Sequence, residues 1–452
     1  MVTRSDEETE ERGWLKRSAS VSLEEVNNTV KIPNKGGFWR KFFAFAGPGS
    51  LVAVGYVDPG NWATSIAGGA RFGYTLLIVI LVANLVAMLL QSLSAKLGIV
   101  TGRDLAQATR DATGKKTAMI LWVLTELAII ATDLAEVIGS AIALNLLFGL
   151  PLLVGIAITT LDVLLLLYLQ KKGFRIIEAI VIVLMATIFA VFAFEVIISK
   201  PEISALFSGF IPRTEIVTNP DMLFISLGIL GATVMPHNLY LHSSIVQTRQ
   251  YKRTIEGKKE ALKFSILDST ISLTLAFFIN AGILILGAAA FYGTNLDVSE
   301  LEAAYELLSP TLGVGIASTL FAVALLASGQ NSTITGTMSG QIVMEGFIQL
   351  RIAPWLRRLI TRLLAVIPAF IVTWLAGAKG TGELLLWSQV VLSLQLPFAV
   401  IPLVLFTSDK KKMGKFANKL PIKITAWLCT VVIVILNIFL IGYIVVTGQD
   451  IG

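Results

Sequence analysis

The residues Asp58-Pro59-Gly60-Asn61 interrupt a hydrophobic stretch that is long enough to cross a lipid bilayer, and Met235-Pro236-His237-Asn238 interrupt a second one. Proline removes a backbone donor and glycine loosens a helix, so we expect both helices to unwind here and free carbonyls at membrane depth. Such backbone is tolerated only where it is buried in protein or lines a cavity. Two breaks at matching positions in two halves of the chain predict an inverted-repeat transporter with its binding site near the bilayer midplane.

The composition is that of an all-α polytopic membrane protein. Of the 452 residues, 55% are hydrophobic and only 15% are charged, which is too apolar for a soluble globular domain. Apolar runs of about 20 residues, the length that crosses a bilayer core, predict eleven transmembrane helices. We expect them at 48–68, 74–97, 117–147, 151–170, 174–198, 222–246, 264–292, 313–338, 358–377, 383–407 and 424–447.

Lysine and arginine predict the orientation of these helices in the cell membrane. If the N-terminus is cytoplasmic, 32 of the 36 Lys and Arg residues fall in cytoplasmic segments. The positive-inside rule therefore predicts a cytoplasmic N-terminus and an extracellular C-terminus. Because the net charge of +6 reflects this topology, it does not indicate nucleic-acid binding. No cleavable signal peptide is expected, and the single cysteine, Cys429, excludes an intramolecular disulfide and a cysteine metal cluster.

Five spans in each half predict two repeats, and an odd number of spans inserts the second repeat upside down relative to the first. The predicted divisions are a cytoplasmic tail at 1–42, a first repeat at 43–199, an extracellular linker at 200–221, a second repeat at 222–407, and a cytoplasmic loop with the eleventh helix at 408–452. The basic loop 250–265 is expected to include a short helix that anchors to anionic lipid at the membrane surface. The acids of 293–312 are interpreted as solvated surface, and they are Asp297, Glu300, Glu302 and Glu306.

The first break offers two oxygen ligands for a cation. Asp58 is a carboxylate that is expensive to bury in a membrane unless it holds a cation or a proton. Asn61 lies three residues farther on, where its amide oxygen can turn toward the same point. In an intact helix, this amide would instead bond a neighbouring helix.

The second break adds a carbonyl and a sulfur atom. Pro236 cannot donate to the carbonyl of Ala232, so that carbonyl is free to bind a ligand. Met235 carries a thioether and stands out from the other methionines, which are interpreted as packing residues, only by its place at the break. A soft sulfur beside hard oxygens suits Mn²⁺ or Fe²⁺ and gives no advantage to Ca²⁺ or Mg²⁺. Gln389, a buried amide of the tenth span, is a further candidate once the site closes around the ion.

The only two histidines of the chain, His237 and His242, follow the second break. Because histidine titrates near neutral pH, His237 is a candidate proton carrier. For His242, a structural hydrogen bond is an equally good interpretation.

Three acids of the third span share one helix face, and they are Glu126, Asp133 and Glu136. Acids cannot face lipid, so we expect them to point into the bundle and either pair with cations or pass protons. Their expected partners are the arginines at the inner end of the ninth span, Arg357, Arg358 and Arg362. A salt-bridge network with a purely structural role is the rival interpretation.

Taken together, the motifs resemble those of the Nramp family of divalent metal transporters, over about residues 43–402. Residues 58–61 match the first-helix signature of that family, and 232–238 match the sixth-helix signature. Residues 131–136 are similar to its third-helix acidic motif, and 329–346 to its transport signature. The resemblance implies a LeuT-like fold, a prokaryotic member, and import of divalent metal ions coupled to protons.

The resemblance also implies roles for individual residues. The implied metal ligands are Asp58, Asn61, Met235 and the carbonyl of Ala232, with Gln389 and the carbonyl of Gly55 joining in some states. The implied proton route comprises His237, Asp58, Asp133 and Glu136, with Glu126, Arg357 and Arg358 beside it. Some relatives have alanine where this chain has Gly55, which implies a more flexible backbone here. We expect no cofactor and a monomer.

Four alternatives remain open. A Mg²⁺-transporting relative would have no use for the thioether of Met235. A sodium-coupled amino-acid carrier of the same fold would meet repulsion between Asp58 and the carboxylate of its substrate. A channel would be expected to carry rings of repeated charge. An intramembrane metalloenzyme would be expected to carry a His-x-x-x-His pair on an unbroken helix.

Overall fold

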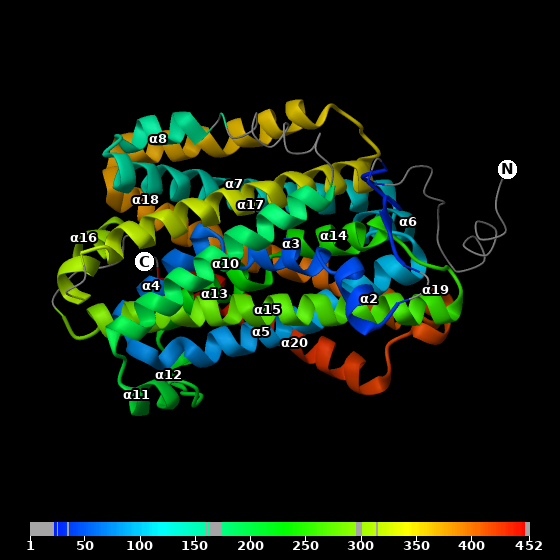
Figure 1. The fold of residues 1–452 in the computed structure, drawn as a ribbon, viewed down its shortest axis with the longest axis horizontal. Coiled ribbons are helices and arrows are strands. Elements are labelled where there is room, and N and C mark those ends of the chain that lie inside the picture. The colour runs from blue at the N-terminus through cyan, green and yellow to red at the C-terminus, as the bar shows by residue number, and fades with distance from the viewer. Residues whose placement is uncertain are drawn as a thin grey trace.

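The structure is a computed structural model that describes residues 22–24, 26–33, 36–159, 161, 174–294, 301–312 and 315–447. Within these residues the chain is almost entirely helical, and its long helices run roughly side by side (Figure 1). The described strands are the two-residue β1 (Val30–Lys31) and β2 (Arg249–Gln250). They pair in parallel register, Val30 with Arg249, and so join the N-terminal segment to the end of the second broken helix.

Helices occupy the position of every predicted span. They are α3 (Pro48–Gly55) with α4 (Pro59–Phe72), α5 (Leu77–Thr101), α7 (Lys115–Phe148), α8 (Leu152–Thr159), α10 (Phe174–Ser199), α13 (Pro220–Val234) with α14 (Pro236–Ile245), α15 (Ile255–Phe291), α17 (Ala317–Ile348), α18 (Pro354–Ser408) and α20 (Leu420–Thr447). The rest of the fourth predicted span, apart from Leu161, lies outside the described residues. The ninth and tenth spans are both in α18, which is divided at Gly377, where φ is 64° and ψ is −151°.

Shorter elements connect these helices. They are α2 (Phe38–Phe45), η1 (Gly73–Leu76), α6 (Leu105–Ala112), α11 (Ile203–Ser208), α12 (Glu215–Thr218), η2 (Val246–Thr248), α16 (Leu301–Leu312), α19 (Lys410–Met413) and η3 (Gly414–Phe416). By length and composition, eight helical stretches of the described chain could cross a membrane, and the first of them runs from Pro59 through η1 to Thr101.

The helix predicted in the basic loop 250–265 is present, but it is the start of a long helix and not a short one. The side chain of Thr254 caps a helix by accepting a hydrogen bond of 3.2 Å from the N–H of Gly257. That helix is α15, which continues to Phe291 because no proline follows the cap to stop it. Of the acids expected at the surface, Glu306 is exposed on α16, whereas Asp297, Glu300 and the side chain of Glu302 lie outside the described residues.

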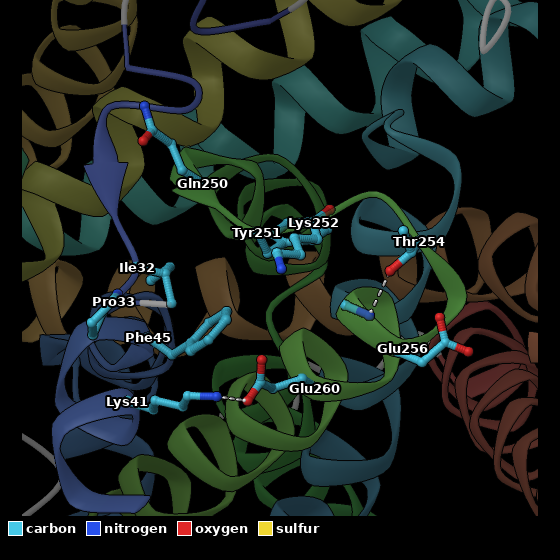
Figure 2. Close-up of a pocket in the computed structure, with 11 residues that line it drawn as sticks. Ile32, Pro33, Lys41, Phe45, Gln250, Tyr251, Lys252, Thr254, Glu256 and Glu260 are labelled. Atoms are coloured by element: carbon cyan, nitrogen blue, oxygen red, sulfur yellow. Dashed lines mark hydrogen bonds and ion pairs between the residues drawn. The ribbon is translucent and has the colours of Figure 1, made fainter. Parts of the chain in front are cut away.

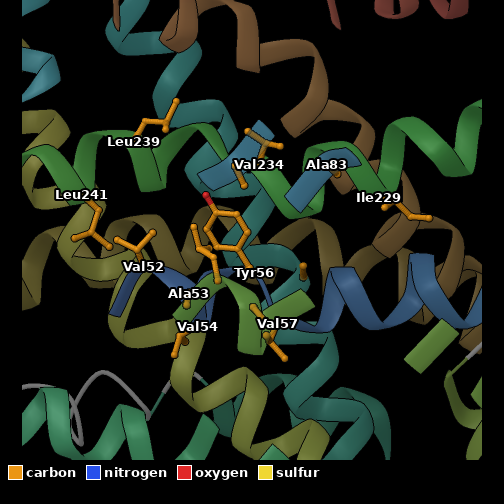
Figure 3. Packing of buried hydrophobic residues seen from close by; sticks show 14 of the residues in the cluster. Val52, Ala53, Val54, Tyr56, Val57, Ala83, Ile229, Val234, Leu239 and Leu241 are labelled. Carbon is orange, nitrogen blue, oxygen red and sulfur yellow. The ribbon is translucent and has the colours of Figure 1, made fainter. Parts of the chain in front are cut away.

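The two broken helices lie in the buried core. Figure 3 shows Tyr56 and Val57 of the first break among Val52 of α3, Val234 of α13 and Leu239 of α14. Tyr56 is completely buried. The long helices α7, α15, α17 and α18 enclose these broken segments. The polar groups of the breaks are therefore held in low-dielectric surroundings, where each must find a partner or a ligand.

Charged groups hold the start of the first broken helix. Gly47, with φ of 133°, joins α2 to α3 in a conformation that favours glycine. Its N–H donates to Oδ2 of Asp268 at 3.1 Å, which places a carboxylate at the N-terminus of α3. On the other side of the joint, Arg249 donates to the carbonyl of Phe45 at 3.1 Å and pairs with Glu178 at 2.6 Å.

A cavity of 590 Å³ opens beside this joint, between the segment that leads into α2 and the turn that leads into α15 (Figure 2). An ion pair between Lys41 and Glu260 crosses it. Lys252 and Glu256 add one further charge of each sign. Because the charges of its lining balance, the cavity does not select an anion or a cation, and no residue of the two breaks lines it.

Candidate metal-binding site

The first break lies just before its proline. Helix α3 ends at Gly55, and α4 begins at Pro59 with Asp58 as its N-cap residue, at φ −70° and ψ 165°. Proline is favoured at the first helical position because its ring presets φ and the missing N–H has no helical partner there. The prediction that Pro59, Gly60 and Asn61 unwind is therefore wrong, because these residues form the first turn of α4. The unwound residues are those from Tyr56 to Asp58.

The second break is a single residue wide. Met235, with φ −6° and ψ 112°, separates the end of α13 at Val234 from the start of α14 at Pro236. Proline again stands at the first helical position, and the carbonyl of Ala232 loses its helical donor as predicted. The side chain of Asn61 supplies a substitute, because its Nδ2 donates to this carbonyl at 2.8 Å.

Asn61 joins the two breaks. Besides its bond to Ala232, its Nδ2 donates to Oδ1 of Asp58 at 2.7 Å, and its backbone N–H donates to the same oxygen at 2.9 Å. Its own Oδ1 accepts from Oγ1 of Thr233 at 3.4 Å. The positive end of the amide thus lies between a carboxylate and a carbonyl from opposite breaks, which is the position that a cation bound by both oxygens would take.

Three buried oxygens at the site lack a hydrogen-bond partner within the described chain. They are Oδ2 of Asp58, Oε1 of Gln389 and Oδ1 of Asn238, and all three side chains are completely buried. The side chain of Gln389 lies against Gly60, where a Cβ would collide with its amide group. Because an unpaired buried carboxylate costs several kcal/mol, Asp58 needs a cation or a proton, whereas the neutral amide oxygens are available as further ligands or hydrogen-bond acceptors.

Met235 and Gly55 are connected through Asn238. The sulfur of Met235 is completely buried and lies 3.7 Å from Nδ2 of Asn238. The same amide fills the space beside Gly55, where a Cβ would collide with it. From the sequence alone, Asn238 is only a member of the second-break motif. Its place one helical turn after Met235 was the signal that could have assigned it a contact.

The chemistry of these groups fits a transition-metal ion. In the described chain, no three His, Cys, Asp or Glu residues converge to hold a metal. The candidate ligands are instead one carboxylate, two amide oxygens, two backbone carbonyls and a thioether. Such a set combines hard and soft donors, which distinguishes it from the all-oxygen sites of Ca²⁺ and Mg²⁺.

The predicted pairing of third-span acids with ninth-span arginines is present between α7 and α18. Nη2 of Arg357 lies 2.8 Å from Oε1 of Glu126, and Nη1 of Arg358 lies 2.7 Å from Oδ1 of Asp133. Asp133 and Arg358 are almost completely buried. Each buried charge here has an opposite charge within the protein, unlike Asp58.

Glu136 shares the arginines of Asp133. Its Oε2 lies 3.4 Å from Nη2 of Arg358 and 3.6 Å from Nη1 of Arg362, and it accepts from Oγ1 of Thr333 at 3.1 Å. Thr333, in α17, was not assigned a role from the sequence, where it appeared as one small polar residue in a run of them. Oε1 of Glu136 has no partner among the described residues.

The two histidines occupy different surroundings. Nδ1 of His237 lies 3.4 Å from Oγ1 of Thr132, the neighbour of Asp133 on α7. His237 is thus next to the acidic network. Nδ1 of His242 lies 3.0 Å from Oε1 of Gln91, whose Nε2 donates to the hydroxyl of Tyr56 at 2.7 Å. His242 therefore makes the structural hydrogen bond that one of its two interpretations requires.

Two broken helices around a buried candidate cation site are typical of a membrane carrier, and comparisons with known proteins show its family. The family described as "Natural resistance-associated macrophage protein-like", Nramp, matches residues 49–442. The chain therefore belongs to the Nramp family. It is a multi-pass membrane protein and a transporter, not an enzyme, and its substrate class is the divalent metal cation.

Individual relatives agree with this placement. The chain is similar to a divalent metal cation transporter, MntH, of Listeria welshimeri, with 65% identity over 97% of this chain and 98% of the relative. The crystal structure of the Eremococcus coleocola manganese transporter is similar with a TM-score of 0.87 and 46% identity, over 93% of this chain and 90% of that one. The more distant Mhp1, a nucleobase-cation-symport-1 family transporter, matches with a TM-score of 0.61 and 16% identity, over 86% and 82%. This match confirms the LeuT-like fold.

Proposed function

We propose that the chain imports divalent transition metal ions, Mn²⁺ or Fe²⁺ and similar ions such as Cd²⁺ and Co²⁺, together with protons across the cell membrane by alternating access. One observation carries the proposal. Asn61 bridges Asp58 to the Ala232 carbonyl across the two breaks, while Oδ2 of Asp58 and Oε1 of Gln389 lack partners in the described chain.

Metal binding in this proposal replaces the positive end of one amide by an ion. A rotation of the Asn61 side chain about its last bond would turn Oδ1, instead of Nδ2, toward Asp58 and the carbonyl of Ala232. The ion would then meet the carboxylate, the amide oxygen, the carbonyl and the sulfur of Met235. The carbonyl of Gly55 and the amide of Gln389 would complete the set in some states of the transport cycle.

Proton coupling in this proposal uses the groups beside the site. A divalent ion at Asp58 repels a proton held there, and the proton can pass by way of His237 toward Asp133 and Glu136. The contact of His237 with Thr132, next to Asp133, supports this direction. The arginines Arg357 and Arg358 neutralise the acids, including Glu126, and so lower the cost of keeping charge in the membrane.

We also propose a monomer with a cytoplasmic N-terminus and an extracellular C-terminus, divided into repeats at 43–199 and 222–407. Figure 1 supports the topology because α2, α6 and α19, which belong to predicted cytoplasmic segments, lie at one end of the long helices. The elements α11, α12 and α16, which belong to predicted outer segments, lie toward the opposite end.

The test is Mn²⁺ uptake into proteoliposomes that contain a pH-sensitive dye. We expect the parent chain to take up Mn²⁺ and acidify the lumen, and Asp58→Ala to do neither. The matched control is Asp221→Ala, which removes an exposed carboxylate at the start of α13 and should behave as the parent. Uptake without acidification would refute proton coupling, and uptake that persists in Asp58→Ala would refute the site.

A further inference from the structure

Helix α20 lies outside the two predicted repeats and is mostly covered with exposed apolar side chains. Two of its polar residues are nonetheless buried, Thr430 and Asn437, with 2% and 4% of their surface exposed. Oγ1 of Thr430 bonds only within its own helix, to the carbonyl of Ala426 at 2.7 Å. Asn437 instead reaches the neighbouring helix, α18.

Asn437 replaces a backbone hydrogen bond that a proline removes from α18. Pro397 has no N–H and stands four residues after Ser393, so the carbonyl of Ser393 has no helical donor. Nδ2 of Asn437 donates to that carbonyl at 3.1 Å, and Oγ of Ser393 donates to Oδ1 of Asn437 at 3.1 Å. A further bond of 2.9 Å from Nδ2 to the carbonyl of Ile433 uses the remaining N–H of the amide.

The turn of α18 that Asn437 stabilises, residues 389–393, begins with Gln389. Ser393 follows Gln389 by one helical turn, and both are completely buried. Helix α13 also approaches this turn, so closely that a Cβ at Gly231 would collide with the backbone of both residues. The turn 389–393 therefore packs against Gly231, next to the candidate carbonyl ligand at Ala232, and is hydrogen-bonded to Asn437.

A helix that lacks a hydrogen bond at a proline bends there unless a neighbour satisfies the freed group. We propose that Asn437 is a positioning residue for metal binding: it holds the proline-weakened turn of α18 so that the amide of Gln389 stays at the first break. This inference rests on the proposed function. It gives α20, the helix outside the predicted repeats, a role in the affinity for the transported ion.

The experiment measures Mn²⁺ uptake by the full-length chain in proteoliposomes, with the amount of folded protein determined for each variant. Asn437→Ala should raise the apparent KM for Mn²⁺ by about ten-fold, the effect expected when a buried hydrogen bond is lost, with a smaller change in maximum rate. Thr430→Val is the matched control, since it removes a buried hydroxyl whose hydrogen bond stays within the same helix, and its KM should equal that of the parent.

Rescue separates positioning from general stability. Pro397→Ala restores an N–H four residues after Ser393, so Asn437→Ala combined with Pro397→Ala should return the KM to within about two-fold of Pro397→Ala alone. The double variant also keeps the test available if Asn437→Ala alone does not fold. A ten-fold difference that persists in the Pro397→Ala background would overturn the inference.

A second pair of variants asks whether Asn437 acts through Gln389. In the Gln389→Ala background, Asn437→Ala should cause no further change in KM, whereas independent effects would multiply and contradict the inference. Failure of the proposed function is distinguishable, because it would appear as uptake that persists in Asp58→Ala. If Asp58→Ala abolishes uptake while Asn437→Ala behaves as Thr430→Val, the positioning role alone is refuted.

Discussion

The two helix breaks and the interface between α7 and α18 treat buried charge in opposite ways. At the breaks, the carboxylate of Asp58 faces the amide of Asn61 instead of a cationic side chain. At the interface, Asp133 meets Arg358 at 2.7 Å. The first region keeps a negative charge that no cationic side chain compensates. In the second region, the acids and the arginines compensate each other. The difference distinguishes the proposed site of the transported ion from a permanent network, to which we assign the proposed proton route.

The largest expected effect is a loss of protein stability in Arg358→Met, at the interface between α7 and α18. Removing the arginine leaves Asp133 buried without its nearest counter-charge, and losing one partner of a buried pair costs about 3–5 kcal/mol. Thermal unfolding of the purified protein in detergent measures the loss. Arg351→Met is the control, because its pair with Glu24 is exposed and worth less than about 1 kcal/mol. Equal stability of the two variants would mean that the interface does not depend on its charge pairs.

A smaller and more selective effect is expected from Met235→Ala. Without the thioether, the remaining candidate ligands are oxygens, so the apparent KM for Cd²⁺ should rise by about ten-fold, or about 1.4 kcal/mol, and Ca²⁺ should compete better. Uptake of Cd²⁺ in the presence of Ca²⁺ gives both quantities. Met338→Ala, which shortens a buried methionine in α17, is the control. An unchanged preference between the two ions would remove the sulfur from the ligand set.

The smallest effect is expected from Gly55→Ala. The added Cβ meets the end of the Asn238 side chain, which can rotate away, so the backbone of the break need not move. We expect a change of less than about three-fold in the KM for Mn²⁺, because only a side-chain contact to the sulfur of Met235 is disturbed. The same uptake assay measures it. Loss of transport in this variant would show that the backbone at Gly55 is held more tightly than the contacts indicate.

Much of the fold followed from local rules. The spans follow from runs of apolar residues, and the acids of α7 could be assigned to one face because 3.6 residues make a turn. Their arginine partners could be named because buried acids need cations, and three arginines lie at the inner end of the ninth span. Which residues unwind could not be derived in the same way. Tyr56 and Val57 carry no turn signal, and a proline fits the start of a helix as well as its interruption.

The long-range contacts of the site could not be read from the sequence either. Nothing near Gln389 indicates that its side chain lies on Gly60, or that Asn437 bonds the carbonyl freed by Pro397. Both depend on how separate helices pack. The bridge made by Asn61 was half predicted. The spacing places its amide beside Asp58, but the amide turns Nδ2 toward Asp58 where the amide oxygen was predicted, and its bond to Ala232 depends on how the two breaks face each other.

Direct binding of Mn²⁺ to the purified protein, followed by isothermal titration calorimetry, tests the central comparison most directly. The parent chain should bind one ion, Asp58→Asn should bind none that can be detected, and Glu136→Gln should bind as the parent because its carboxylate belongs to the self-neutral network. Binding that survives Asp58→Asn but is lost in Glu136→Gln would contradict the account, because the ion would then sit between α7 and α18 and not between the two breaks.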